Sequence, residues 1–267
     1  MTLLKRLYVA ARALALRLVA NQQVRRVVMP LAGLVTRVRT RGMSVQERWN
    51  HSIGWEVSFW DDWLRTPEAE RRLDPATPLD GPPTLVRCIE QLGTEHVRIV
   101  DVGAGPVTPI GRVMPGHTIE VTATDALASE YDEVLARAGI VPPVRTIFAH
   151  AERLSETVPH DFDIAYCANA LDHMYDPALA VESMLAVVRP GGFVVLNHFA
   201  NEGEIQHYTG LHQWNIDERG GDFVIWGKDS SENMTTRLAD EATVECTRFP
   251  DPRGSRLEIA IRKHPVS

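Results

Sequence analysis

Cysteine is scarce in this sequence of 267 residues. The three cysteines, Cys88, Cys167 and Cys246, lie far apart and form no CxxC pair. Neither a disulfide framework nor a zinc site built from cysteines is therefore expected. A reducing, cytoplasmic compartment is the default prediction.

Acidic residues are missing from the first 46 positions, which contain nine Lys or Arg. The rest of the chain holds 19 basic and 35 acidic residues. Such an acidic body is a poor binder of nucleic acid, because contacts to phosphate dominate that affinity. A small molecule or a glycan is the expected substrate.

The N-terminal region also lacks a long apolar run. Its longest uncharged stretch, Val27–Thr36, has ten residues, about half of the ~20 that a membrane-spanning helix needs. Residues 1–42 instead predict a basic amphipathic leader helix, with leucines at helical spacing between Lys and Arg. This helix either contacts anionic membrane from the side or packs on the body or on a partner in a homodimer.

From Val97 onward, short β-branched runs alternate with helical stretches. This alternation predicts an α/β fold with a parallel sheet and helices on both faces. The runs are Arg98–Val102, Ile119–Thr124, Val144–Phe148, Asp163–Cys167 and Phe193–Asn197, followed by a hairpin of Ala242–Phe249 and Arg256–Arg262. Ligands of such sheets bind beyond the carboxyl ends of the strands.

Two of these strand ends carry residues suited to a nucleoside. DVGAGP follows the first strand, and Gly103 and Gly105 allow the backbone to turn and approach a ligand closely. Asp125 ends the second strand, where a carboxylate can accept both ribose hydroxyls. Thr108 stands where a dinucleotide fingerprint has its third glycine, so NAD is disfavoured as the ligand.

Five motifs occur in order between Val97 and Asn197: DVGAGP, ATDA, AHAERL, FDIAYCANALDHMYDP and RPGG. With them the sequence resembles the class I S-adenosylmethionine-dependent methyltransferases of the type 11 group. The resemblance implies a Rossmann-like sheet of seven strands and S-adenosyl-L-methionine as cofactor. The cofactor-binding residues that it implies are Asp101, Gly103, Ala104, Gly105, Asp125, Ala126, Ala151, Glu152 and Asn169.

The segment before the sheet is rich in tryptophan, and a capping box at Ser44–Glu47 predicts the start of its helix. EVSFWDDWL and RRLDP resemble the N-terminal cap of type 11 methyltransferases from bacterial polysaccharide and glycolipid pathways. The expected organisation is thus a leader (1–42), a Trp-rich helical cap (43–90) and a methyltransferase domain (91–267). That domain carries an insertion on the substrate side, at 198–221.

Three residues are the candidates for catalysis. His173, beside Asp172 after the fourth strand, suits the removal of a proton from an alcohol at neutral pH, and His198 after the fifth strand is the reserve. Asp172, His198 and Glu202 form an alternative ligand set for a divalent ion such as Mg²⁺.

Side chains of the cap and the insertion are the candidates for substrate binding: Trp55, Trp60, Glu202, His207, Tyr208, His212 and Trp214. The other interpretation is structural, because a Trp-rich helix also packs at a domain edge and an insertion also forms a packed surface loop. The predicted function is methyl transfer to a hydroxyl of a sugar or oligosaccharide. The alternatives are a small-molecule acceptor other than a sugar, and a non-catalytic methyltransferase-like protein that binds a membrane or a partner.

Overall fold

The computed structural model describes residues 42–252 and 254–265. The predicted leader, apart from Gly42, lies outside these residues. Within the described part of the chain, no helix combines the length and the apolar character needed to cross a membrane.

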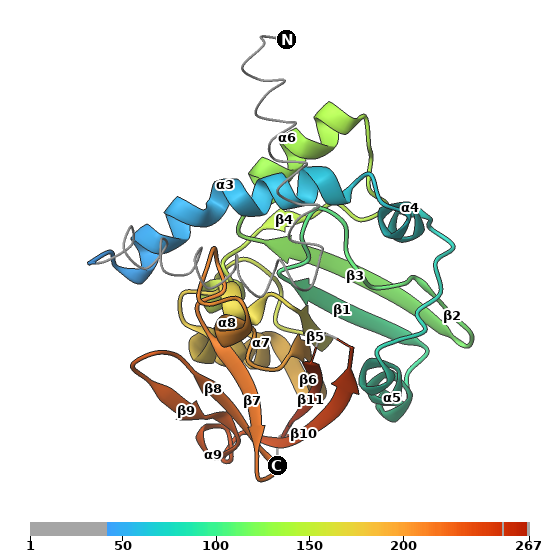
Figure 1. Ribbon diagram of the computed structural model, residues 1–267. Helices are drawn as coiled ribbons and strands as arrows, with labels where there is room; N and C mark the ends of the chain where they lie inside the picture. The colour runs from blue at the N-terminus through green and yellow to red at the C-terminus, as the bar shows by residue number, and fades with distance from the viewer. Residues whose placement is uncertain (1–41, 253, 266–267) are drawn as a thin grey trace.

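A sheet of eight strands forms the centre of the molecule (Figure 1). Its order is β10-β11-β6-β5-β1-β3-β2, and β4 also pairs with β3. The strands β1, β3, β4, β5 and β6 are parallel, whereas β11 is antiparallel to both β6 and β10. Their bounds are β1 (His96–Val102), β2 (Val113–Met114), β3 (His117–Asp125), β4 (Ile147–Phe148), β5 (Phe162–Ala168), β6 (Val188–Phe199), β10 (Ala242–Asp251) and β11 (Gly254–Lys263).

This arrangement confirms the predicted Rossmann-like α/β fold and its C-terminal hairpin. Two details differ from the prediction. The strand expected at Val144–Phe148 shortens to β4, and β2 adds an eighth strand at the edge. A strand as short as β2 has no hydrophobic period that a sequence could reveal.

Helices cover both faces of the sheet. Along β1, Val97 and Ile99 join the core that contains α5, while Val100 and Val102 join the core that contains α7. This alternation follows from the two-residue period of a strand. The helices are α3 (Val45–Trp63), α4 (Pro67–Leu73), α5 (Pro83–Leu92), α6 (Ala128–Ala138), α7 (Pro177–Val187), α8 (Glu202–Ile205) and α9 (Met234–Arg237), with the 3₁₀ helices η1 (Ala151–Glu156) and η2 (Leu171–His173).

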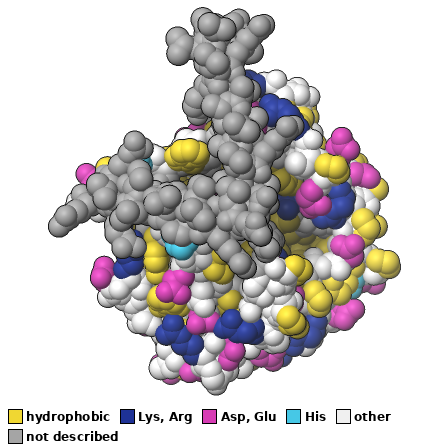
Figure 2. Space-filling model, in the orientation of Figure 1, with side chains coloured by type: hydrophobic (Ala, Val, Ile, Leu, Met, Phe, Trp, Pro, Cys, Tyr) yellow, Lys and Arg dark blue, Asp and Glu magenta, His cyan; other side chains and the backbone are white. Residues whose placement is uncertain are grey.

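A second, antiparallel sheet lies between β6 and β10 in the chain. It contains β7 (Asn215–Arg219), β8 (Asp222–Trp226) and β9 (Ser231–Asn233). The stretch predicted as an insertion at 198–221 therefore comprises the end of β6, then α8, a series of turns and β7. Where this part of the molecule is visible in Figure 2, basic and acidic side chains are interspersed.

Side-chain caps begin α3, as predicted, and α7. Ser44 Oγ accepts a hydrogen bond from Glu47 N at 3.2 Å, and Glu47 Oε2 accepts one from Ser44 N at 2.7 Å. Asp176 Oδ1 accepts one from Leu179 N at 3.0 Å, with Pro177 in the first turn of α7. These bonds satisfy amides that a helix leaves free at its start.

The cap of α7 gives a test of stability. Asp176→Ala should lower the free energy of unfolding by about 1 kcal/mol, because the Leu179 amide loses its acceptor. Denaturant unfolding measures this change, with Asp229→Ala, an exposed aspartate outside any helix, as the control. Equal stability of both variants and the wild type would contradict the role of the cap.

Candidate functional site

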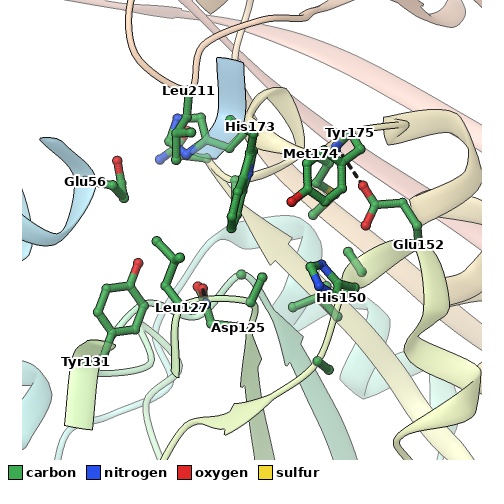
Figure 3. Close-up of a pocket in the computed structure, with 18 of the residues that line it drawn as sticks. Glu56, Asp125, Leu127, Tyr131, His150, Glu152, His173, Met174, Tyr175 and Leu211 are labelled. Atoms are coloured by element: carbon green, nitrogen blue, oxygen red, sulfur yellow. Dashed lines mark hydrogen bonds between the residues drawn. The ribbon is translucent and has the colours of Figure 1, made fainter. Parts of the chain in front are cut away.

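A cavity of about 620 Å³ opens at the carboxyl ends of the parallel strands (Figure 3). Its walls come from the segments that follow β1, β3, β4 and β5, and from α3 on the opposite side. The predicted site residues that line it are Trp60, Gly103, Asp125, Ala126, Ala151, Glu152, Asn169 and His173. The cavity is open to solvent, and this volume includes space outside the protein surface.

The turn after β1 depends on its two glycines. Gly103 has φ +73° and Gly105 has φ +66°, a region that other residues rarely adopt. A Cβ on Gly103 would lie 2.4 Å from Ala170 Cβ, and one on Gly105 would lie 2.6 Å from the Trp60 ring. Because neither glycine has a side chain, this turn packs closely against Ala170, which precedes η2, and against Trp60 of α3.

Asp125 holds the turn from the neighbouring strand. Its Oδ2 accepts a hydrogen bond from Gly105 N at 3.0 Å, and its Oδ1 accepts one from Leu127 N at 2.8 Å. Burial raises the pKa of this carboxyl to about 6, although both amides lower it. Asp125 lines the cavity, so an acidic group lies at the position predicted for the ribose.

Asp101 lies behind the turn and not on the cavity wall. Its side chain is buried, and Oδ2 accepts a hydrogen bond of 2.6 Å from the Thr108 hydroxyl. Burial raises the pKa of Asp101 to about 7. Thr108 occupies the position of the third glycine in a dinucleotide fingerprint. Its role here is to donate a hydrogen bond to Asp101.

Aromatic rings form the wall beyond β4. Trp49 lies 5.1 Å from Tyr175 and 6.4 Å from His150, measured between ring centroids. Glu152 Oε1 accepts hydrogen bonds from Tyr175 N at 2.7 Å and Asp176 N at 3.2 Å, so this carboxylate also fixes the start of α7. Eleven lining residues were not assigned from the sequence, among them Trp49, Glu56, Tyr131, Tyr175 and Leu211.

Trp55 and Trp60 lie on different sides of α3. Trp60 lines the cavity and donates from Nε1 to Glu56 Oε1 at 2.8 Å. Trp55 is 72% exposed and does not line the cavity. The tryptophan pattern pointed to this helix, but only the packing of α3 shows which ring faces inward.

A cluster of polar side chains lies where η2 meets the insertion. His212 Nδ1 lies 2.6 Å from Asp172 Oδ2 and 3.1 Å from His173 Nε2, and His173 Nε2 lies 3.7 Å from Asp172 Oδ2. Burial alone would raise the pKa of Asp172, but the adjacent histidines lower it to about 2. Burial would likewise lower the pKa of His212, but its bond to Asp172 raises it.

His198, the reserve candidate, is buried in β6 outside the cavity lining. Burial lowers its pKa to about 4, and neither ring nitrogen has a hydrogen-bond partner among the described residues. The predicted ion site of Asp172, His198 and Glu202 does not form. Among residues 42–252 and 254–265, the ligand atoms that converge belong to Asp172, His173 and His212.

None of the insertion residues predicted to bind substrate lines the cavity, although Leu211 beside them does. Trp214 Nε1 donates to Met174 O at 2.9 Å, and Gln213 N donates to Asp172 O at 3.0 Å. Tyr208 accepts a hydrogen bond from Asn215 at its hydroxyl. Besides Asp101, Trp55 and His198, the predicted residues outside the lining are Ala104, Gly105, Asp172, Glu202, His207, Tyr208, His212 and Trp214.

Part of the chain is similar to a described protein family. Residues 100–196 match the family model described as a methyltransferase domain. A ubiquinone biosynthesis O-methyltransferase of Pseudomonas aeruginosa is 29% identical over 113 residues, which is 40% of this chain and 47% of that protein. The corresponding protein of Methylococcus capsulatus is 28% identical over 99 residues, or 36% of this chain and 41% of its own. The matches thus span less than half of these relatives.

Solved structures of similar proteins have low sequence identity. A SAM-dependent methyltransferase from Aquifex aeolicus is 14% identical with a TM-score of 0.43, over 76% of this chain and 96% of its own. One from Methanosarcina mazei is 17% identical with a TM-score of 0.42, over 70% of this chain and 100% of its own. The names of these relatives do not mention sugars or polysaccharides, so the predicted likeness to polysaccharide enzymes finds no support among them.

The buried carboxyl of Asp101 gives a prediction for stability. Its pKa is raised in the folded state, so the folded protein keeps a proton that the unfolded chain releases above about pH 4. The free energy of unfolding of the wild type, relative to Asp101→Asn, should therefore fall between about pH 4 and pH 7 and then level off. Urea unfolding of both proteins across this range measures the difference, and a difference independent of pH would contradict the assignment.

Proposed function

We propose that this protein transfers a methyl group from S-adenosyl-L-methionine to a hydroxyl oxygen of a small acceptor. The observation that carries this proposal is the cavity at the carboxyl ends of β1, β3 and β5, with Asp125 on its wall. The match of residues 100–196 to the methyltransferase domain supports it independently.

The residues of the cavity fit this cofactor in their chemistry. Gly103 and Ala126 leave backbone exposed beside Asp125, whose carboxylate is suited to the hydroxyls of a ribose. Ala151 and Glu152 would border the adenine, with the rings of His150 and Tyr175 nearby. Asn169, with φ +50°, would face the methionine portion.

The cofactor supplies, when bound, a methyl group on a sulfonium, whose sulfur keeps the electron pair as the acceptor oxygen bonds to the methyl carbon. The chain has to hold the acceptor in line with that bond and to remove the hydroxyl proton. His173 is the member of the Asp172 cluster that lines the cavity, so we assign proton removal to this cluster. His198 is less suited, because it is buried outside the lining.

Two acceptor classes follow from two different observations. A saccharide hydroxyl follows from the ring of Trp60 on the cavity wall, because aromatic faces stack on sugar rings. A phenolic hydroxyl follows from the relatives whose names assign them to ubiquinone biosynthesis. The leader of residues 1–42 stays a prediction for contact with a membrane or a second copy, and no nucleic-acid partner is proposed.

Incubation of the full chain with cofactor labelled at the methyl group, a panel of glycans and a panel of phenols tests this function. Label in one panel, with S-adenosylhomocysteine as the second product, is the expected result and identifies the acceptor class. Separate calorimetric titration with S-adenosylhomocysteine tests the cofactor site alone. Absence of binding there would overturn the proposal, and the non-catalytic alternative would gain support if binding occurs without transfer to any acceptor.

Asp125 is the residue whose change tests the cofactor site most directly. Asp125→Asn should weaken cofactor binding about tenfold or more, because charge-assisted hydrogen bonds to the ribose contribute ~1.5–3 kcal/mol each. Asp132→Asn is the matched control, since Asp132 lies in α6 outside the cavity lining and pairs with Arg145. Equal affinities of the two variants would remove Asp125 from the site.

A further inference from the structure

We infer that Asp172, His173 and His212 form a binding site for a divalent transition-metal ion at the edge of the cavity. Asp172 and His173 belong to η2, whereas His212 belongs to the insertion. His212 follows Asp172 by 40 residues and His173 by 39. One ligand atom of each meets the others within 4.8 Å.

The distances between these atoms suit a shared cation. Nitrogen and carboxylate ligands bind zinc-like ions at about 2.0–2.2 Å, so two ligands of one tetrahedral ion lie about 3.3–3.6 Å apart. The three separations here are 2.6, 3.1 and 3.7 Å, which bracket that range. To bring all three atoms onto one ion, the separation between His212 Nδ1 and Asp172 Oδ2 would widen by about 0.7 Å, and the other two would change by a few tenths of an ångström.

Hydrogen bonds among the three residues leave one atom poorly satisfied. His212 Nδ1 must carry its proton to donate to the Asp172 carboxylate at 2.6 Å, so this nitrogen cannot also accept a proton from His173. His173 Nε2 can then only share the same hydrogen at 3.1 Å. A cation in place of that hydrogen would satisfy both imidazoles and the carboxylate.

The backbone holds the three residues in place. Gln213 N donates to Asp172 O at 3.0 Å, directly after His212, and Trp214 Nε1 donates to Met174 O at 2.9 Å, directly after His173. The Asp172 side chain is 3% exposed, whereas those of His173 and His212 are 18% and 30% exposed. The cluster is therefore fixed at its base and open on the side of the histidines.

The donor set indicates the class of ion. Two imidazoles and one carboxylate favour Zn²⁺, Co²⁺ or Fe²⁺ over Mg²⁺, which prefers oxygen ligands. Three protein ligands leave positions for other oxygens, as in catalytic zinc sites. If the proposed function holds, the acceptor hydroxyl would take such a position beside His173, and the ion would lower its pKa. The proton would then pass to solvent, and the acceptor oxygen would attack the methyl carbon.

Metal binding to the full chain tests the site without any acceptor. Chain freed of metal by a chelator is titrated with Co²⁺, whose visible absorption reports nitrogen and oxygen ligands, and then with Zn²⁺ and Mg²⁺. One Co²⁺ per chain, displaced by Zn²⁺ and not by Mg²⁺, is the expected result. No binding at equivalence, or a preference for Mg²⁺, would overturn the inference.

Variants locate the ion. His212→Asn keeps a donor toward Asp172 and removes the imidazole, and it should weaken binding of Co²⁺ at least 10–100-fold, the loss that follows even indirect changes to a metal site. His173→Asn should do the same. His207→Asn, in the same insertion, should bind as the wild type, because its ring is not part of the cluster. Wild-type affinity in both cluster variants would overturn the inference.

A second readout separates this inference from the proposed function. Titration of each variant with S-adenosylhomocysteine, together with its thermal midpoint, shows whether the fold and the cofactor site survive. If His212→Asn unfolds, loss of Co²⁺ binding in folded His173→Asn decides the matter. If the chain binds Co²⁺ but no S-adenosylhomocysteine, the inferred metal site is supported and the proposed methyltransferase function is overturned.

Discussion

The in-register parallel pairing of β1 with its two neighbours determines where the chemistry of this chain lies. Val102 pairs with Thr124 of β3, and Asp101 pairs with Tyr166 of β5, so these strands end at one edge of the sheet. Buried side chains cover both faces, and a shift of one residue would turn each of those faces to the wrong side. The positions of Gly103, Asp125 and Asn169 around one cavity follow from this pairing.

Acidic groups are concentrated at this edge, and the charge of Arg72 compensates burial of the Asp101 carboxyl only in part. Burial raises the pKa of both Asp101 and Asp125, and Glu56 from α3 adds a further negative charge that acts on Asp125. Removing water from carboxylates costs free energy unless an opposite charge compensates it. A ligand with positive charge, as a sulfonium and an ammonium group provide, would supply that compensation.

Local features of the site could be predicted from the sequence, because strand ends and turns carry their own signals. Gly103, Asp125, Ala151 and His173 each follow a recognisable run, and each lines the cavity. Tertiary packing decides the rest. Trp55 and Trp60 were equivalent candidates until the rotation of α3 distinguished them.

The contact between His212 and Asp172 was equally hidden, since the sequence assigned the two residues to different tasks. Their separation of 40 residues has no period or spacing that a motif could reveal. The ion set predicted from the sequence failed for the same reason, because His198 points into a buried position and Glu202 lies on α8. The sequence thus indicated that acidic and histidine side chains gather here, but it did not indicate which of them contact one another.

The insertion reaches the cavity chiefly through one short stretch, in which Leu211 lines the wall and the next three residues bond to η2. Its other contacts include hydrogen bonds to β8, β10 and β11. The nucleoside half of the cavity is lined instead by the segments that follow β1, β3 and β4. On the proposed function, a change at Leu211 would therefore alter the choice of acceptor while the nucleoside half of the site stays the same.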